Sequence, residues 1–308
     1  MNLNRLKSNI EELEKLLSDY ELQLKENENN FSLKLQVNSL NNQINDLREQ
    51  LYLENLKREK EILELRLIGD KTKYGNIPLN FVGGITNNFS NFLYNTSKYL
   101  KFGNKGGKKR EAIIQETIDL RFEGLGKGST IFYLSAKTSP DLFGNSITQQ
   151  ALENSFKLLS SENSDEISDN ISGVGGKSIK YLSKFLNELV KSNIEIDIKW
   201  ESPFDKIYEW EGKKDKLTSL FNTLNKITIS EPEEIDFEGE LITISLKGKF
   251  EILTNEKIRY FGQFSNDLLD KMKEFHIGDH CKGIIIKTTI YNPLSDKEKV
   301  EYNLKSIN

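Results

Sequence analysis

Apolar residues recur at alternating spacings of four and three in the first part of the chain, which is the pattern of a coiled-coil seam. One run extends from Leu6 to Leu24, and a second run, in a new phase, extends from Leu33 to Leu51. The seam positions, which we expect to drive oligomerisation, are Leu6, Ile10, Leu13, Leu17, Leu24, Leu33, Val37, Leu40, Ile44, Leu47 and Leu51. The pattern continues less regularly through Leu63 and Leu67 to Gly69, a residue suited to end a helix. The sequence therefore predicts coiled-coil helices over residues 1–69.

A polar stretch from Glu26 to Asn30 separates the two runs and has poor helix propensity. It is either the turn of an antiparallel helical hairpin or a discontinuity in one long rod. We favour the hairpin, because consecutive Asn-rich polar residues suit a helix–helix loop. In both arrangements the second helix is longer than the first. A partner chain or the following domain must therefore cover the apolar surface of the second helix.

From Tyr74 the chain becomes rich in Gly, Pro and aromatic residues, which marks a domain boundary. Residues 74–230 alternate helical and strand patterns and predict one α+β domain. The predicted helices cover residues 81–100 (interrupted at Gly83), 149–159, 179–190 and 217–227, and the predicted strands cover 118–122, 130–134, 194–200 and 206–210. Residues 101–110 and 160–172 are predicted to be loops.

Residues 231–308 follow a linker at Glu231–Glu234 and are dominated by strand patterns. Strands are predicted over residues 235–246, 249–253, 258–261, 281–291 and 300–304, with one helix over 266–275. This pattern predicts a small antiparallel β-sheet or partly open barrel with one helix. The fold class is therefore α+β, with coiled-coil helices at the start and a small β-rich domain at the end.

The amino-acid composition constrains the cellular compartment and the kinds of binding partner that we expect. A hydrophobic fraction of 36% and a mean hydropathy of −0.55 fit a chain with a solvent-exposed helical segment. The net charge of −4 provides no overall attraction to nucleic acid or membranes. No signal peptide or membrane-spanning run is recognisable, and the single cysteine, Cys281, fits a reducing compartment. We expect a cytoplasmic protein, and the abundance of Asn, Lys and Ile suggests a bacterial source.

The clearest nucleic-acid candidate is a basic segment interleaved with Tyr99 and Phe102. Its cations are Lys98, Lys101, Lys105, Lys108, Lys109 and Arg110. Cations on glycine-rich chain can follow a phosphate backbone, and aromatic rings can stack on bases. The alternative is an ordinary solvated group of surface lysines.

Both histidines and the only cysteine lie together in the segment from His276 to Cys281. With Asp279 and His280 they are metal-ligand types. Their spacing matches no common zinc motif, and neighbouring residues of a strand point to opposite faces. We expect a structural role, with Cys281 buried and the histidines near the surface, and we predict no metal and no cofactor.

Two further features have a structural and a functional interpretation. The segment Gly173–Ser178 resembles a phosphate loop before a helix, but Ile171 stands where the motif needs a glycine, and no apolar strand precedes it. Trp200, Tyr208 and Trp210 form an aromatic group that suits either a ligand groove or, as we favour, the core of the α+β domain.

The layout of coiled-coil helices, an α+β domain and a small β-rich end, with several short segments within it, resembles that of coiled-coil plus α+β proteins encoded in bacterial anti-phage defence loci. The segments are Gly128-Ser129-Thr130-Ile-Phe-Tyr, Leu142-Phe-Gly-Asn-Ser146, Gly239-Glu-Leu241 and Lys249-Phe-Glu-Ile252. The resemblance implies a role in antiviral defence and carries no mechanism or site.

Three functional hypotheses follow. The leading hypothesis is a non-catalytic oligomeric assembly or sensor subunit that recognises a protein or nucleic-acid ligand. The second is a nucleic-acid-binding protein that uses the segment from Lys98 to Arg110. The third is a metal-dependent enzyme that uses the segment from His276 to Cys281.

Overall fold

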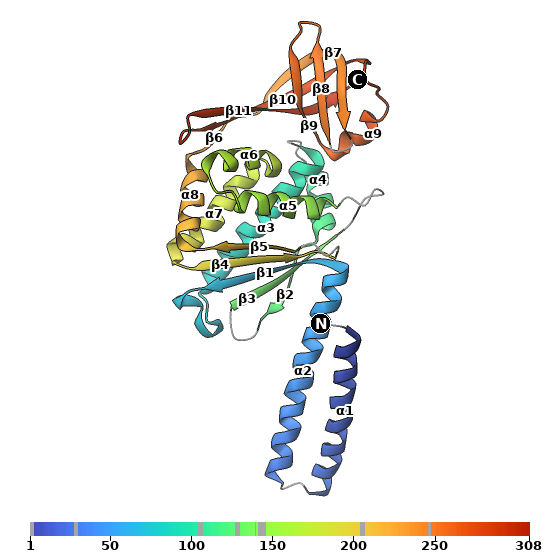
Figure 1. The fold of residues 1–308 in the computed structure, drawn as a ribbon, viewed down its shortest axis with the longest axis vertical. Helices are drawn as coiled ribbons and strands as arrows, with labels where there is room; N and C mark the ends of the chain where they lie inside the picture. Colours follow the sequence, from blue (N-terminus) through green and yellow to red (C-terminus); the bar gives the residue numbers. More distant parts are fainter. Residues whose placement is uncertain are drawn as a thin grey trace.

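The structure is a computed structural model with three parts along one long axis (Figure 1). We call them the stalk (α1 and α2), the body (β1 to α8) and the barrel (β6 to β11). The described residues are 3–27, 30–103, 107–126, 130–138, 140, 146–203, 207–245 and 248–308.

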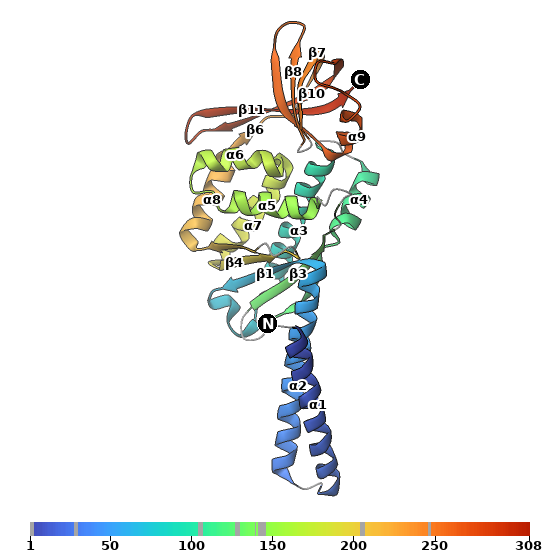
Figure 2. The same cartoon turned by 45° about the vertical axis from the view of Figure 1, so that its right-hand side comes forward.

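The stalk is an antiparallel helical hairpin of α1 (Leu3–Glu26) and α2 (Phe31–Glu59). Leu6 and Ile10 of α1 and Leu40 and Ile44 of α2 are buried. Arg48 Nη2 lies 2.7 Å from Glu14 Oε1 across the pair. The predicted hairpin is therefore confirmed, and a continuous rod is excluded. Two views agree that the stalk extends away from the body (Figures 1 and 2).

The predicted helix through Leu67 is wrong, because α2 ends at Glu59 and β1 (Lys60–Ile68) follows without a linker. The side chains of Leu63, Leu65 and Leu67 are buried, as alternation along a strand requires. β1 pairs antiparallel with β3 on one side and β4 on the other. Backbone pairing on both sides thus overrides the four-residue spacing that suggested a helix.

The body contains a five-stranded antiparallel sheet in the order β2-β3-β1-β4-β5. Its other strands are β2 (Arg121–Leu125), β3 (Thr130–Lys137), β4 (Glu195–Glu201) and β5 (Ile207–Gly212). Its helices are α3 (Leu79–Phe102), α4 (Lys108–Ile118), α5 (Ile147–Leu159), α6 (Ser164–Val174), α7 (Gly176–Ser192) and α8 (Lys214–Lys226). A short 3-10 helix, Asp70–Gly75, follows β1.

Helices cover the face of the sheet that points away from the stalk (Figure 1). The main core lies between the sheet and these helices, and it includes Leu63, Phe92, Phe185 and Trp200. The opposite face carries charged side chains such as Lys199 and is not covered by helices in this view (Figure 1).

Three predictions for the body need correction. Gly83 does not interrupt α3, which is continuous. The predicted loop at residues 101–110 ends earlier, because Lys108 begins α4. The predicted acidic loop at residues 160–172 is largely helix α6, since Asn163 caps its first turn and Ile167 and Ile171 are buried. Packing of a narrow apolar stripe outweighs the poor propensity of the Ser and Asp residues around it.

The barrel joins β7, β8, β9, β11 and β10 into a closed circuit, because β11 pairs with β9 and β10. Its strands are β6 (Thr228–Ile229), β7 (Glu233–Ser245), β8 (Lys249–Thr254), β9 (Arg259–Phe264), β10 (His280–Asn292) and β11 (Lys297–Ile307). A 3-10 turn (Asn266–Leu268) and α9 (Leu269–Met272) lie between β9 and β10. The β9–β11 pair is parallel and closes the barrel. The predicted β-rich module with one helix is confirmed.

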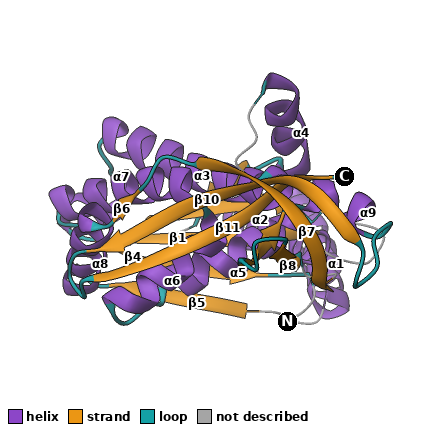
Figure 3. Cartoon of the chain, turned by 90° about the horizontal axis from the view of Figure 1, so that it is seen from above, coloured by secondary structure: helices purple, strands orange, loops and turns teal. Residues whose placement is uncertain are grey.

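The barrel packs on the helical layer of the body. Seen from above, β10 and β11 cross over this layer (Figure 3). Asn292 Nδ2 donates to the backbone oxygen of Ser164 at 3.0 Å, and Lys299 Nζ lies 2.9 Å from Asp169 Oδ1. Ile290 of β10 belongs to the core of the body. The end of the β10–β11 hairpin is therefore seated on α6.

The segment Gly173–Ser178 spans the end of α6 and the start of α7, so a helix and not a strand precedes it, which excludes the strand–loop–helix form of a phosphate loop. Gly175 joins α6 to α7 with φ +81°, and a Cβ there would lie 2.6 Å from Cγ of Tyr99. The backbone conformation and the close approach of Tyr99 both require glycine at this position.

Alanine substitutions at two glycines are expected to change stability in opposite directions. Gly175→Ala should lower the melting temperature, because the new methyl group meets Tyr99 in a strained backbone conformation. Gly83→Ala should stabilise by about 0.5–1 kcal/mol, since it lies within α3 with nothing within 4 Å of its Cβ position. Thermal unfolding of both variants tests this, and equal shifts would contradict the assignment.

Candidate functional site

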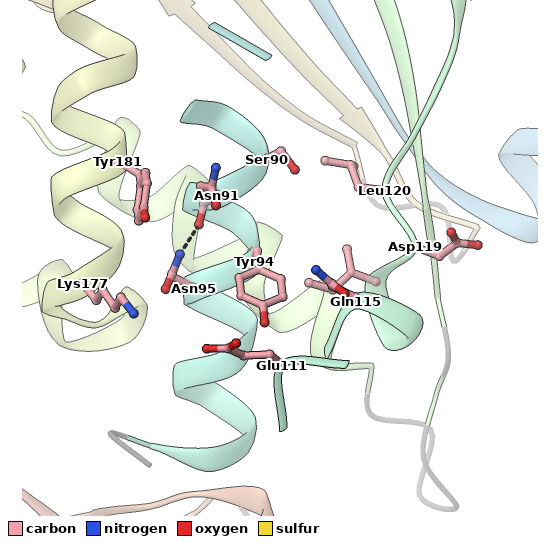
Figure 4. Close-up of a pocket in the computed structure, with 11 residues that line it drawn as sticks. Ser90, Asn91, Tyr94, Asn95, Glu111, Gln115, Asp119, Leu120, Lys177 and Tyr181 are labelled. Atoms are coloured by element: carbon pink, nitrogen blue, oxygen red, sulfur yellow. Dashed lines mark hydrogen bonds between the residues drawn. The ribbon is translucent and has the colours of Figure 1, made fainter. Parts of the chain in front are cut away.

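The body carries a polar cleft of about 460 Å³ between α3, α4 and α7 (Figure 4). In this view α3 forms the floor, with α7 on one side and α4 on the other (Figure 4). We call it the polar cleft. Its lining residues are Ser90, Asn91, Tyr94, Asn95, Glu111, Gln115, Ile118, Asp119, Leu120, Lys177 and Tyr181.

Helical spacing positions the floor of the polar cleft. Asn91 and Asn95 lie one turn apart on α3, and Asn95 is itself buried, three residues after the buried Phe92. Asn91 Nδ2 donates to the backbone oxygen of Asn87 at 2.8 Å, and Asn95 Nδ2 donates to that of Asn91 at 2.7 Å. A backbone oxygen only accepts, so these bonds fix which amide atom is nitrogen.

An ion pair anchors the α4 wall of the polar cleft. Lys98 Nζ lies 2.9 Å from Glu111 Oε1, and the Lys98 side chain is only 9% exposed. The hydrogen bond from Lys98 and then its charge hold the pKa of Glu111 below its usual value, so this carboxylate is ionised at neutral pH. Partial burial and the nearby Glu111 charge raise the pKa of the Tyr94 hydroxyl, which therefore stays protonated.

The structure places the cations of the predicted basic segment in different environments. Lys98 is buried against Glu111, while Lys101 and Arg110 lie 5.9 and 5.8 Å from the centre of the Phe102 ring. Lys108 and Lys109 are exposed on the first turn of α4, and Lys105 lies outside the described residues. Nucleic-acid contact through this segment remains a prediction.

The predicted aromatic group belongs to the core. Trp200 and Trp210 are buried, and Trp200 stacks on Tyr208 with 4.8 Å between the ring centres. Trp200 Nε1 donates to Oε2 of Glu61 at 2.9 Å. Glu61, on β1, is fully buried at the end of the sheet beside Gln149, Ser202 and Thr138, and sequence inspection missed it. Its signal was an acidic residue directly before the apolar pair Ile62 and Leu63.

The residues of the candidate metal segment diverge. Cys281 is buried, while His276 and His280 are exposed, as expected. His276 Nδ1 lies 3.6 Å from Asp279 Oδ2, whereas His280 Nε2 lies 3.4 Å from Asn255 Oδ1. Burial, and secondarily the charge of Asp279, raise the pKa of the Cys281 thiol. Across the described part of the chain, no three His, Cys, Asp or Glu side chains gather where they could hold a metal ion.

The outer face of the barrel carries an exposed aromatic ring that sequence inspection also missed. Arg259, Phe261 and Gln263 alternate outward on β9, and Phe261 is 69% exposed. Lys249 of β8 pairs in register with Gln263. Phe261, Gln263 and Lys249 line a cleft of about 240 Å³ where the barrel meets α3 and α6.

Comparison with protein-family models, curated proteins and solved structures found no match for this chain. No helix within the described ranges is both long and apolar enough to cross a membrane.

The buried Glu61 carboxyl is expected to make stability depend on pH. Burial raises its pKa above the ordinary 4.5, and the hydrogen bond from Trp200, with the polar side chains of Ser202, Gln149 and Thr138 nearby, offsets this only in part. The folded state therefore binds the proton more tightly than the unfolded state, and this stabilisation is present below the unfolded pKa. It is lost as the pH rises through the raised value.

Glu61→Gln should therefore raise the melting temperature more at about pH 8 than at about pH 5, by several degrees, because it stays neutral and can still accept from Trp200. Glu209→Gln, on the exposed face of the same sheet, serves as the control. A pH-independent effect of Glu61→Gln would show that its carboxyl is not the group concerned.

Proposed function

We propose that this protein is a recognition subunit that binds an unpaired nucleic-acid strand on its barrel and assembles through its stalk. The exposed Phe261 ring, on an outward strand face beside a cleft, carries this proposal. A five-stranded Greek-key barrel of this kind resembles the oligonucleotide- and oligosaccharide-binding (OB) barrels, which bind ligands on the face of their second and third strands. Here those strands are β8 and β9.

The side chains around Phe261 favour a strand of nucleotides as the ligand over other kinds of ligand. Phe261 lies between Arg259 and Gln263 on β9 and opposite Glu251 of β8. An exposed ring offers a stacking surface for a base, while Lys249 and Arg259 flank it as cations for phosphates. Gln263 adds an amide that can bond to a base edge.

The distribution of charged side chains on the barrel limits binding of the strand to the face formed by β8 and β9. The outward side chains of β7 include Asp236, Glu238 and Glu240, which repel phosphate. Arg259 also pairs with Glu251 at 3.1 Å. The affinity should therefore depend more on stacking than on charge, and the salt dependence should be shallow, with a slope of about −0.7 to −1.4 for one or two phosphates.

Phe261→Ala should weaken binding of a labelled single strand of about 12 nucleotides by roughly 1–3 kcal/mol, the usual contribution of one stacked base. Fluorescence anisotropy on the full chain measures this. Phe122→Ala is the matched control, because Phe122 is also exposed (57%) but lies on β2 of the other sheet. Equal affinities of the parent and Phe261→Ala, or no binding by the parent, would reject the nucleic-acid function.

The stalk supports self-association. Its buried apolar contacts are Leu6, Ile10, Leu40 and Ile44, whereas near the turn Leu22 and Leu35 are exposed. A single hairpin cannot cover all apolar positions of its two helices, and two antiparallel hairpins can complete one another as a four-helix bundle. We infer that the distal half of the stalk binds a second copy of this chain.

Replacing Leu22 and Leu35 together with Ser should lower the mass of the assembly in solution, because it removes exposed apolar area from the proposed interface. Light scattering on the full chain provides the measurement. Leu79→Ser is the control, since Leu79 is 83% exposed at the start of α3 in the body. A parent chain that is already monomeric would disprove self-association.

A further inference from the structure

The polar cleft takes no part in the function proposed for the barrel, yet its chemistry points to a ligand. It combines two tyrosines, a lysine, the two ionised carboxylates of Glu111 and Asp119 and three side-chain amides within about 460 Å³. That volume lies in the range of small-molecule sites, which typically enclose 300–1,000 Å³.

The floor of the polar cleft presents hydrogen-bond acceptors. The Nδ2 atoms of Asn91 and Asn95 both donate to backbone oxygens of α3, so their NH₂ groups are held against the helix. The remaining polar atom of each amide, Oδ1, is an acceptor. Such acceptors suit a ligand that carries an amino group.

The α7 wall presents an aromatic ring and a cation one helical turn apart. Tyr181 and Lys177 both face the cleft from this helix (Figure 4). Lys177 lies in the first turn of α7, where the helix dipole adds to its positive charge. This side of the cleft therefore suits a flat ring with an anionic group nearby.

The α4 wall presents a fixed carboxylate. Glu111 is held by Lys98 at 2.9 Å and stays ionised at neutral pH. Carboxylates accept hydrogen bonds from sugar hydroxyls, as acidic residues do with ribose in dinucleotide sites. The α7 wall therefore offers a site for an anionic group, and the opposing α4 wall offers a site for hydroxyl groups.

We propose that the polar cleft binds a ribonucleoside monophosphate whose base carries an exocyclic amino group. The base lies against Tyr181 and donates its amino hydrogens to Asn91 or Asn95. Its phosphate pairs with Lys177, and its ribose hydroxyls donate to Glu111. This site is separate from the barrel face and goes beyond the recognition function proposed above.

Calorimetric titration of the full chain with AMP, CMP, UMP and dAMP tests the proposal. AMP or CMP should bind, while UMP, which lacks the amino group, and dAMP, which lacks one hydroxyl, should each bind about tenfold more weakly or worse. Inorganic phosphate tests whether the cleft binds the anion alone, and free glutamine tests whether it binds an amino acid instead of a nucleotide. Tighter binding of glutamine, equal binding of all four nucleotides, or no heat from any of them would overturn the proposal.

Matched variants locate the site. Lys177→Gln and Tyr181→Ala should each weaken AMP or CMP binding at least about tenfold, whereas Lys180→Gln, exposed on α7 outside the lining, should leave it unchanged. Tyr181→Phe should retain most of the affinity, because the ring provides the contact. The Tyr181→Ala variant should still bind the labelled single strand, so failure of the cleft and failure of the barrel are distinguishable.

Discussion

The backbone pairing of β1 on both of its edges is the constraint on which the remaining architecture depends. β1 lies between β3 and β4, and without it the five-stranded sheet would separate into two hairpins. The helices of the body pack on this sheet, and the barrel packs in turn on α6. The shape of the polar cleft depends on the same contacts, because α3 and α7 pack on the core that β1 completes.

Elements with a clear period were predictable from the sequence. The heptad seam gave both stalk helices, and alternating residues gave most strands of the barrel. β1 was missed because Leu63 and Leu67 are four residues apart and continue the heptad pattern, whereas Ile62 and Leu65 break it. α6 was missed because its polar residues have low helix propensity, and only tertiary packing of Ile167, Ile171 and Val174 stabilises the helix.

The candidate sites were much less predictable. The polar cleft brings together side chains from three helices, and one of these, α4, was itself partly assigned to a loop. Lys98 was counted among surface cations, because its burial depends on the later Glu111 coming within 2.9 Å. The recurrence of Asn87, Asn91 and Asn95 at one-turn spacing was a usable signal for a polar helix face. The outward direction of Phe261 was indicated only by the polar Arg259 and Gln263 two residues away on either side, a short pattern that the other strand aromatics obscured.

The continuous passage from α2 into β1 also has a mechanical consequence. At about 1.5 Å per residue, the 29 residues of α2 form a rigid arm roughly 43 Å long. Tyr52 Oη donates to Glu123 Oε2 at 2.8 Å, and Lys60 Nζ lies 3.3 Å from Glu123 Oε1, so the arm is braced against β2 where it enters the sheet. Because no linker absorbs bending or rotation at this point, a torque applied at the far end of the stalk is transmitted directly to the central strand.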